Sequence, residues 1–248
     1  MFFNILNISV RSIKLDDLLK LLCKGVLITP NVDHLVKLQK DKEFYNVYKK
    51  ADWVICDSNF VNLAAKILGT SLLEVIPGSS LLPAYYNYHK NNRNIQIFLL
   101  GAKEGVALKA QKNINQKVGW DIVSGAFSPS FGFENNEIEC NQIIKIINES
   151  KCNVLVVGVG APKQEKWIMK YKEKLPNIDL FMALGATIDF EAGNIKRAPV
   201  LFQKLYLEWF YRFLVEPRRL WRRYFIEDPL FFWYIFKQKT GIYKNPFE

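Results

Sequence analysis

CNVLVVGVGAPKQEKW, residues 152–167, joins a wholly apolar run to a glycine turn and then to an amphipathic segment. A strand with one solvated face alternates apolar and polar residues, whereas a strand that is apolar throughout is buried on both faces. Strands of the second kind belong to parallel sheets covered by helices. The stretch therefore predicts a buried parallel strand, a tight turn at its carboxyl end and a helix that begins there.

The same pattern recurs along the chain up to about residue 195. Apolar runs alternate with amphipathic segments such as NVDHLVKLQKD (31–41), NFVNLAAKILG (59–69) and KEGVALKAQKNINQKVG (103–119). The further apolar runs are GVLIT (25–29), DWVIC (52–56), IQIFLLG (95–101) and IDLFMALG (178–185). This alternation predicts the α/β class, with a Rossmann-like, mostly parallel sheet and helices on both of its faces.

The composition restricts the class of protein further. Half of the 248 residues are hydrophobic, which excludes global disorder, and the formal charge of +10 indicates an anionic partner without identifying it. The four cysteines are far apart and include no CxxC pair, which is typical of reduced thiols in a cytosolic protein. The amino-terminal stretch has no basic residues before its apolar run and so does not resemble a signal peptide. No apolar run reaches the roughly 18 residues of a membrane-spanning helix. We therefore expect the chain on the cytoplasmic side of the membrane.

The composition changes from Arg197 onward. Residues 200–248 contain 16 of the 35 aromatic residues, and EWFYRFLVEPRRLWRRYF (208–225) adds five arginines to its aromatics. The apolar strand pattern stops, and helices punctuated by Pro217 and Pro229 are expected instead. We predict two parts: an α/β catalytic body at residues 1–196 and a basic, aromatic, helical appendage at residues 197–248.

Polar residues follow several of the predicted strands directly. In open α/β sheets, ligands bind outside the carboxyl ends of the strands. The residues at these positions are Thr29, Asn31, Asp57, Gly158 to Gln164, Thr187 and Asp189. A parallel sheet would bring them to one edge. Asn31 and Asp57 each have a structural alternative, because either side chain could cap the helix that follows it.

The turn at residues 158–164 begins like a dinucleotide-binding loop. Lys163 occupies the position of the last glycine in GxGxxG, so the pattern favours a phosphate-facing turn over a cofactor fingerprint. Pro162 suits the first turn of the following helix. The sequence has no DxD, no HExxH and no pair of histidines at metal-binding spacing. We therefore expect neither a metal nor a cofactor.

Taken together, these motifs resemble the WecG/TagA/CpsF glycosyltransferases over residues 25–225. The matching stretches are TPN (29–31), Asp57 after ADWVIC (51–56), PGSSLL (77–82), GVGAPKQEKW (158–167), GATIDFEAG (185–193), KRAP (196–199), EWFYR (208–212) and EPRRLWRRY (216–224). The resemblance implies an inverting, metal-independent enzyme that transfers a hexosyl or N-acetylhexosaminyl group, such as N-acetylmannosaminyl. The implied donor is a UDP-sugar and the implied acceptor is a sugar linked through diphosphate to a polyprenyl lipid, in the synthesis of cell-surface polysaccharide.

The resemblance also implies roles for individual residues. Asp57 becomes the general base, with Thr29, Asn31 and Gln164 around it in the catalytic pocket. The implied substrate-binding residues are Gly158, Gly160, Pro162, Gly185, Thr187, Asp189 and Arg197. The sequence departs from the family at Ser58, where a glycine is usual, and at Val75, where the family often has an arginine before the PGS-like turn. Donor or acceptor preference is expected to differ accordingly.

We expect the carboxyl-terminal appendage to have two functions. Without a metal, cations must stabilise the leaving diphosphate, and most arginines available for this lie in the appendage. The candidates are Arg212, Arg218, Arg219, Arg222 and Arg223. Aromatic residues flanked by arginines also suit the headgroup boundary of an anionic membrane, which predicts peripheral association with its cytoplasmic face.

Three alternatives remain open from the residues alone. A basic nucleic-acid-binding module would explain the charge and the aromatics, but no nucleic-acid-binding motif is present, so no nucleic-acid partner is expected. A nicotinamide-dependent oxidoreductase would require the glycine fingerprint that Lys163 interrupts. An appendage that docks a homo-oligomer is compatible with the glycosyltransferase, and the oligomeric state is left open.

Overall fold

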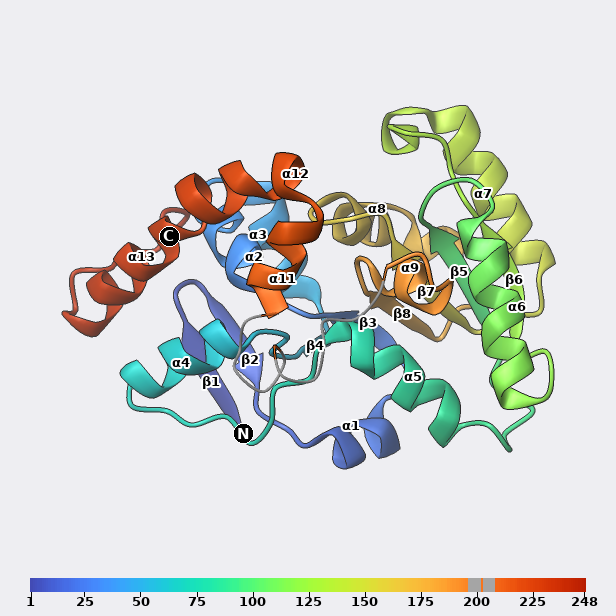
Figure 1. The fold of residues 1–248 in the computed structure, drawn as a ribbon, viewed down its shortest axis with the longest axis horizontal. Helices are drawn as coiled ribbons and strands as arrows, with labels where there is room; N and C mark the ends of the chain where they lie inside the picture. The colour runs from blue at the N-terminus through green and yellow to red at the C-terminus, as the bar shows by residue number, and fades with distance from the viewer. Residues whose placement is uncertain (196–201, 203–207) are drawn as a thin grey trace.

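The computed structural model describes residues 1–195, Phe202 and residues 208–248. A parallel sheet of six strands, in the order β4-β3-β8-β7-β5-β6, lies at the centre (Figure 1). Its strands are β3 (Gly25–Ile28), β4 (Trp53–Val54), β5 (Ile97–Gly101), β6 (Val123–Phe127), β7 (Val154–Gly158) and β8 (Leu180–Ala183), and each neighbouring pair runs parallel. The predicted α/β class and parallel sheet are confirmed.

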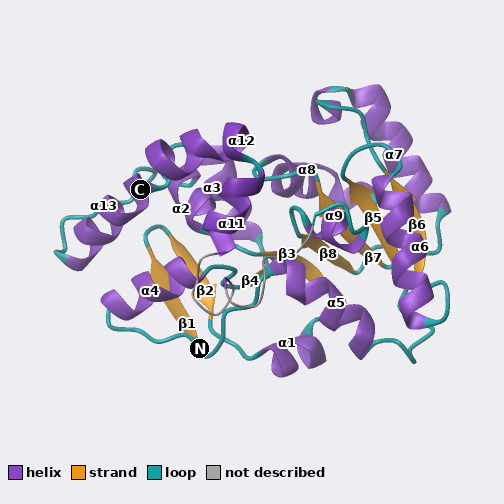
Figure 2. Cartoon of the chain, viewed as in Figure 1, coloured by secondary structure: helices purple, strands orange, loops and turns teal. Residues whose placement is uncertain are grey.

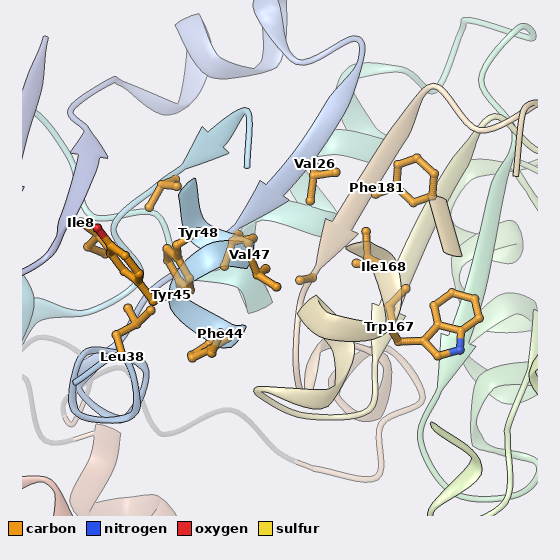
Figure 3. Packing of buried hydrophobic residues seen from close by; sticks show 14 of the residues in the cluster. Ile8, Val26, Leu38, Phe44, Tyr45, Val47, Tyr48, Trp167, Ile168 and Phe181 are labelled. Carbon is orange, nitrogen blue, oxygen red and sulfur yellow. The ribbon is translucent and has the colours of Figure 1, made fainter. Parts of the chain in front are cut away.

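Helices cover the sheet on both faces (Figure 2). They are α1 (Leu15–Leu21), α2 (Val32–Lys37), α3 (Lys42–Lys50), α4 (Asn59–Ile67), α5 (Gly78–Tyr88), α6 (Val106–Val118), α7 (Glu137–Glu149), α8 (Lys163–Tyr171) and α9 (Thr187–Glu191), with short 3-10 turns η1 (Phe133–Asn135) and η2 (Lys172–Lys174). Successive strand side chains point to opposite faces, so each strand contributes to two cores. In β8, for example, Met182 packs into the core with α1, α5 and α6, and Phe181 packs into the core with α3 and α8. Figure 3 shows the second of these cores, with Phe181 close to Ile168 of α8.

The carboxyl ends of β5, β7 and β8 approach each other closely at three glycines. A Cβ atom added to Gly101 would lie 2.5 Å from the carbonyl oxygen of Gly158. A Cβ atom added to Gly158 would lie 2.6 Å from the carbonyl oxygen of Gly185. Real side chains do not tolerate such distances, so glycine is required at positions 101 and 158.

The amino terminus forms an antiparallel hairpin that the apolar pattern does not predict. Its strands are β1 (Phe2–Ile5) and β2 (Ile8–Arg11). Arg11 makes an isolated parallel bridge to Ile55, just after β4, and its guanidinium lies 4.2 Å from the ring centroid of Trp53. The hairpin therefore covers the edge of the sheet at its shortest strand.

The carboxyl-terminal helices pack against the first half of the chain. They are α11 (Glu208–Val215), α12 (Pro217–Arg222), the π-helix η3 (Arg223–Glu227) and α13 (Pro229–Lys239). Phe231 and Ile235 of α13 are buried in the same core as Phe181. The Tyr243 hydroxyl donates to the Gln39 side chain, and the Tyr45 hydroxyl donates to Glu248. Among the described helices, none combines the length and hydropathy needed to cross a bilayer. The predicted boundary near residue 196 falls outside the described residues and stays a prediction.

Candidate active site

The polar residues predicted from the strand ends do converge on one edge of the sheet. Thr29 directly follows β3, and the backbone N–H of Asp57, beyond β4, donates to the carbonyl oxygen of Pro30 over 3.3 Å. Gly78 closes over this edge, because a Cβ atom there would lie 3.4 Å from Thr29 Oγ1 and 3.2 Å from a methyl carbon of Leu184. Thr29 is buried and Asp57 is partly exposed. The edge therefore brings Thr29 and Asp57 onto neighbouring backbone segments.

The structure separates the two capping alternatives. Asn31 is the N-cap of α2, and its side-chain oxygen accepts from the His34 N–H over 3.2 Å. The cap of α4 is Ser58, whose hydroxyl accepts from the Phe60 N–H over 3.2 Å. The capping alternative is confirmed for Asn31 and is wrong for Asp57. The departure from the family at Ser58 supplies a helix cap, and Val75, the other departure, packs partly buried against the core.

Two helices hold the turn between β7 and α8. Gly160, at a φ of +89°, donates its N–H to Gln164 Oε1 over 3.1 Å. Lys37 of α2 donates to the Ala161 carbonyl oxygen over 3.2 Å. Pro162 is the N-cap residue of α8, one position before the first turn in which the sequence placed it. The predicted residues Gly158, Gly160, Pro162 and Gln164 thus form one braced turn at the sheet edge.

Helix α9 brings the last pair of predicted residues to the same edge. Thr187 is its first residue and is buried, and Asp189 lies in its first turn. Glu191 anchors the other end of α9, because its carboxylate accepts from Lys117 over 2.7 Å and from the Tyr86 hydroxyl over 3.2 Å. The loop that begins at Gly185 is thereby held between β8 and a fixed helix.

The predicted donor-binding arginines are only partly described. Arg197 lies outside the described residues, and the side chains of Arg212 in α11 and Arg219 in α12 also lie outside the described part. Arg218 and Arg222 of α12 are exposed, and Arg222 Nε lies 3.4 Å from Glu227 Oε1. Their role in binding the donor stays a prediction.

A buried polar cluster behind the turn was not predicted. Lys37 Nζ lies 2.8 Å from Asp33 Oδ2, and Arg223 of η3 lies 3.9 Å from the other Asp33 oxygen. The His34 ring shares a 2.6 Å hydrogen bond with the Tyr48 hydroxyl. The remaining members are Gln164 and Glu165 of α8, joined by a 2.7 Å hydrogen bond from Gln164 Nε2 to Glu165 Oε1. Helices α2, α3, α8 and η3 therefore meet through polar groups.

Burial and neighbouring charges set the protonation of this cluster. Burial lowers the pKa of His34 to about 3, so its ring is neutral at physiological pH. Burial acts to raise the pKa of Asp33, but the positive charges of Arg223 and Lys37 outweigh it and hold that pKa below its ordinary value. Burial raises the pKa of Glu165 to about 7, with the negative charge of Asp33 acting in the same direction.

The sequence carries only a partial signal for the burial of Glu165. The buried residues of α8 include Gln164, Trp167, Ile168 and Tyr171, and Glu165 lies three positions before Ile168 on this face. The charged types in QEKW instead suggest a solvated surface. Only packing against α2 and α3 shows that the carboxylate is buried.

The described residues include no group of three or more His, Cys, Asp or Glu side chains that could hold a metal ion. All four cysteines are unpaired, as expected for reduced thiols, and three of them are buried.

In open parallel α/β sheets, ligands bind outside the carboxyl ends of the strands, where these polar residues gather. The chain belongs to the glycosyl transferase WecG/TagA/CpsF family, whose model matches residues 3–245. The resemblance predicted from the motifs is thus confirmed, and the protein is a glycosyltransferase. The family match therefore favours the glycosyltransferase interpretation over the oxidoreductase and the nucleic-acid-binding module.

Curated relatives of the chain come from Staphylococcus aureus. The N-acetylglucosaminyldiphosphoundecaprenol N-acetyl-beta-D-mannosaminyltransferases of strains NCTC 8325 / PS 47 and COL are 29% identical to it over 227 residues. The match covers 88% of this chain and 82% of each relative. The protein of the same description from strain MW2 matches to the same extent.

The buried imidazole of His34 predicts an acid-sensitive fold. The depressed pKa means that unfolding takes up a proton between the ordinary value of 6.5 and about 3. The stability that His34 contributes is present above pH 6.5 and is lost as the pH falls. The free energy of unfolding of the wild type should decrease by about 1.4 kcal/mol more per pH unit than that of His34→Gln, measured by urea unfolding.

The other histidine provides the control for this comparison. His89 is less buried, so His89→Gln should change the pH dependence less. Glu165 titrates in an overlapping range but is present in all three chains, so its effect cancels. Parallel pH profiles for the wild type and His34→Gln would contradict a neutral, buried His34.

Proposed function

We propose that the chain transfers an N-acetylmannosaminyl group, or a related hexosyl or N-acetylhexosaminyl group, from a UDP-sugar to a polyprenyl-diphosphate-linked N-acetylglucosamine. The product would serve cell-surface polysaccharide synthesis. The donor and acceptor sugars follow the description of the Staphylococcus aureus relatives. The observation that carries the proposal is the position of Asp57, beside Thr29 and at the same sheet edge as the turn braced by Gln164.

Asp57 is the proposed general base of an inverting transfer. The acceptor hydroxyl oxygen attacks the anomeric carbon while its proton passes to the Asp57 carboxylate. The bond from that carbon to the diphosphate oxygen breaks, and UDP leaves with the electron pair. Attack opposite the leaving group inverts the anomeric configuration. The N-cap of α4 is Ser58, and an ionised carboxylate such as that of Asp57 is the kind of group that serves as a general base.

The leaving diphosphate needs positive charge or N–H donors as the bond breaks. We propose that the turn at Gly158, Gly160 and Pro162 contributes backbone donors and that α9 contributes Thr187 and Asp189 to the nucleotide pocket. Arginine suits diphosphate better than lysine because its fork donates two parallel hydrogen bonds. The proposed arginines are Arg197, Arg212, Arg218, Arg219 and Arg222. In this mechanism the cationic groups replace a metal ion.

A single assay tests which sugar is transferred and whether the transfer requires a metal ion. A panel of UDP-sugars is incubated with polyprenyl-diphosphate-linked N-acetylglucosamine in excess EDTA, and UDP release is measured. We expect turnover with UDP-N-acetylmannosamine that EDTA does not reduce. Activity that is lost in EDTA and restored by a divalent ion would contradict the metal-independent mechanism. The absence of turnover with every UDP-sugar would contradict the proposed function.

Replacing Asp57 should separate catalysis from folding. Asp57→Asn keeps the shape of the side chain but removes the base, so kcat should fall by about 10²–10⁴-fold with donor affinity little changed. Ser58→Ala is the matched control, because loss of the cap should cost about 1 kcal/mol of stability and leave most of the turnover. Normal turnover by Asp57→Asn would remove Asp57 from the mechanism.

The carboxyl-terminal helices are the proposed membrane-binding surface. They expose large apolar side chains on α11, α12, η3 and α13, next to basic residues. These side chains belong to Phe210, Leu214, Val215, Trp221, Phe225, Ile226, Phe232, Trp233 and Phe236. A surface of this kind can enter the headgroup boundary without spanning the bilayer. We propose peripheral binding to the cytoplasmic leaflet, where the lipid-linked acceptor would be available.

Vesicle binding tests this surface. The double variant Trp221→Ser, Trp233→Ser should bind anionic liposomes at least about tenfold more weakly, because two half-exposed aromatic side chains no longer enter the boundary. Phe131→Ser is the control, since Phe131 is fully exposed and precedes α7, a helix that lies on the opposite side of the molecule from α13 (Figure 1). Equal loss in both variants, or none in either, would contradict a membrane surface on these helices.

A further inference from the structure

Gln164 lies between two groups that can each bind only one end of its amide. Its Oε1 accepts from the backbone N–H of Gly160 over 3.1 Å, and its Nε2 donates to Glu165 Oε1 over 2.7 Å. A backbone N–H can only donate, and an ionised carboxylate can only accept. If the amide turned by 180°, its NH₂ group would face the Gly160 N–H and its oxygen would face the carboxylate. Both hydrogen bonds therefore favour the same orientation of the Gln164 amide.

We propose that Glu165 is a positioning residue of the transfer site, which orients the Gln164 amide and through it holds the turn at Gly160. Glu165 is fully buried, and its Oε2 has no hydrogen-bond partner among the described residues. A buried carboxylate with one unsatisfied oxygen destabilises the fold, so packing does not account for its presence. The kinetic consequence rests on the function proposed above.

The turn has a second, independent brace. Lys37 donates to the Ala161 carbonyl oxygen and is itself held by Asp33. Lys37 thus acts on the carbonyl side of the turn and Gln164 on its N–H side. Removing Glu165 should therefore displace the Gly160 N–H without unfolding the turn.

The charge of Glu165 decides how strongly the orientation is selected. An ionised carboxylate accepts a stronger, charge-assisted hydrogen bond, whereas a protonated one carries an O–H that can also donate to the flipped amide oxygen. The groups facing Glu165 are Asp33 and Lys37 from α2 and Tyr48 from α3. Burial raises the pKa of Glu165 to about 7, so the selection should strengthen as the pH rises through neutrality.

The raised pKa of Glu165 predicts the opposite pH dependence for the stability of the fold. A carboxyl group whose folded pKa is raised contributes stability that is present below its ordinary pKa of 4.5 and is lost as the pH rises through about 7. Glu165→Gln stays neutral, so its stability relative to the wild type should increase with pH over this range. A residue that served only to stabilise the fold would not show this opposition between stability and turnover.

The experiment compares the full-length wild type with Glu165→Gln, Glu165→Ala and Glu173→Gln. Glu173 is an exposed acid of η2, with 87% of its side chain accessible, and is the matched control. The first measurement is amide hydrogen exchange, which needs no substrate. We expect the Gly160 N–H to exchange at least about tenfold faster in Glu165→Ala, with Glu165→Gln intermediate. The Gly119 N–H, bonded to Asn115 in α6, should not change.

The second measurement is the pH profile of UDP release. The wild type should show kcat/KM rising through an ionisation near pH 7, which Glu165→Gln lacks. Glu165→Ala should lower kcat by about 10–100-fold across the range, with a smaller change in the KM of the donor, as expected for a misplaced turn. Glu173→Gln should match the wild type.

The outcomes distinguish this inference from the proposed function. Unchanged Gly160 exchange in Glu165→Ala would overturn the positioning role, and so would a wild-type pH profile in Glu165→Gln. If the Gly160 N–H exchanges faster in Glu165→Ala but the wild type turns over no UDP-sugar, the exchange result would still support the role of Glu165 in the turn. That result would at the same time reject the proposed function.

Discussion

Backbone contact between Gly101, Gly158 and Gly185 is the constraint on which the site depends. A Cβ atom at Gly101 or Gly158 would come within 2.6 Å of a neighbouring carbonyl oxygen, so these strand ends approach this closely only with glycine at those two positions. This close approach places the turn after β7 and the loop after β8 side by side. Asp57, Thr29 and the braced turn then lie along one edge, where loops can bind a ligand while the sheet stays rigid.

Polar contacts join that edge to the carboxyl-terminal helices. Asp33, in the first turn of the helix that Asn31 caps, pairs with Lys37 and lies near Arg223 of η3. Asp228, beside η3, lies 3.6 Å from Arg223, and burial raises its pKa to about 6. The carboxyl-terminal segment is thus in electrostatic contact with α2, which carries one of the proposed pocket residues. The segment that we propose binds the membrane is thus also a neighbour of the proposed transfer site.

The aromatic composition of the carboxyl-terminal segment serves two environments. Leu220, Phe231 and Ile235 are buried, whereas Trp221, Phe232 and Trp233 are about half exposed. The sequence shows that aromatic residues are concentrated there, but adjacent residues differ in burial: Phe231 is buried and Phe232 is about half exposed. Helical phase and the position of the partner surface decide between them, and the second of these is a property of the folded chain.

The sequence by itself determined the class of fold and the residues that follow each strand at the carboxyl edge of the sheet. Wholly apolar runs predict buried parallel strands, and polar residues directly after them lie at the carboxyl edge, because both patterns are local and periodic. The tertiary structure alone decided that Ser58 caps α4, that a hairpin covers the β4 edge and that Glu165 faces Gln164 in the core. Each of these depends on which surface lies opposite a residue. A carboxylate in an amphipathic helix has the same local sequence signal whether it meets water or a buried amide, so only the packing of α8 against α2 and α3 could reveal it.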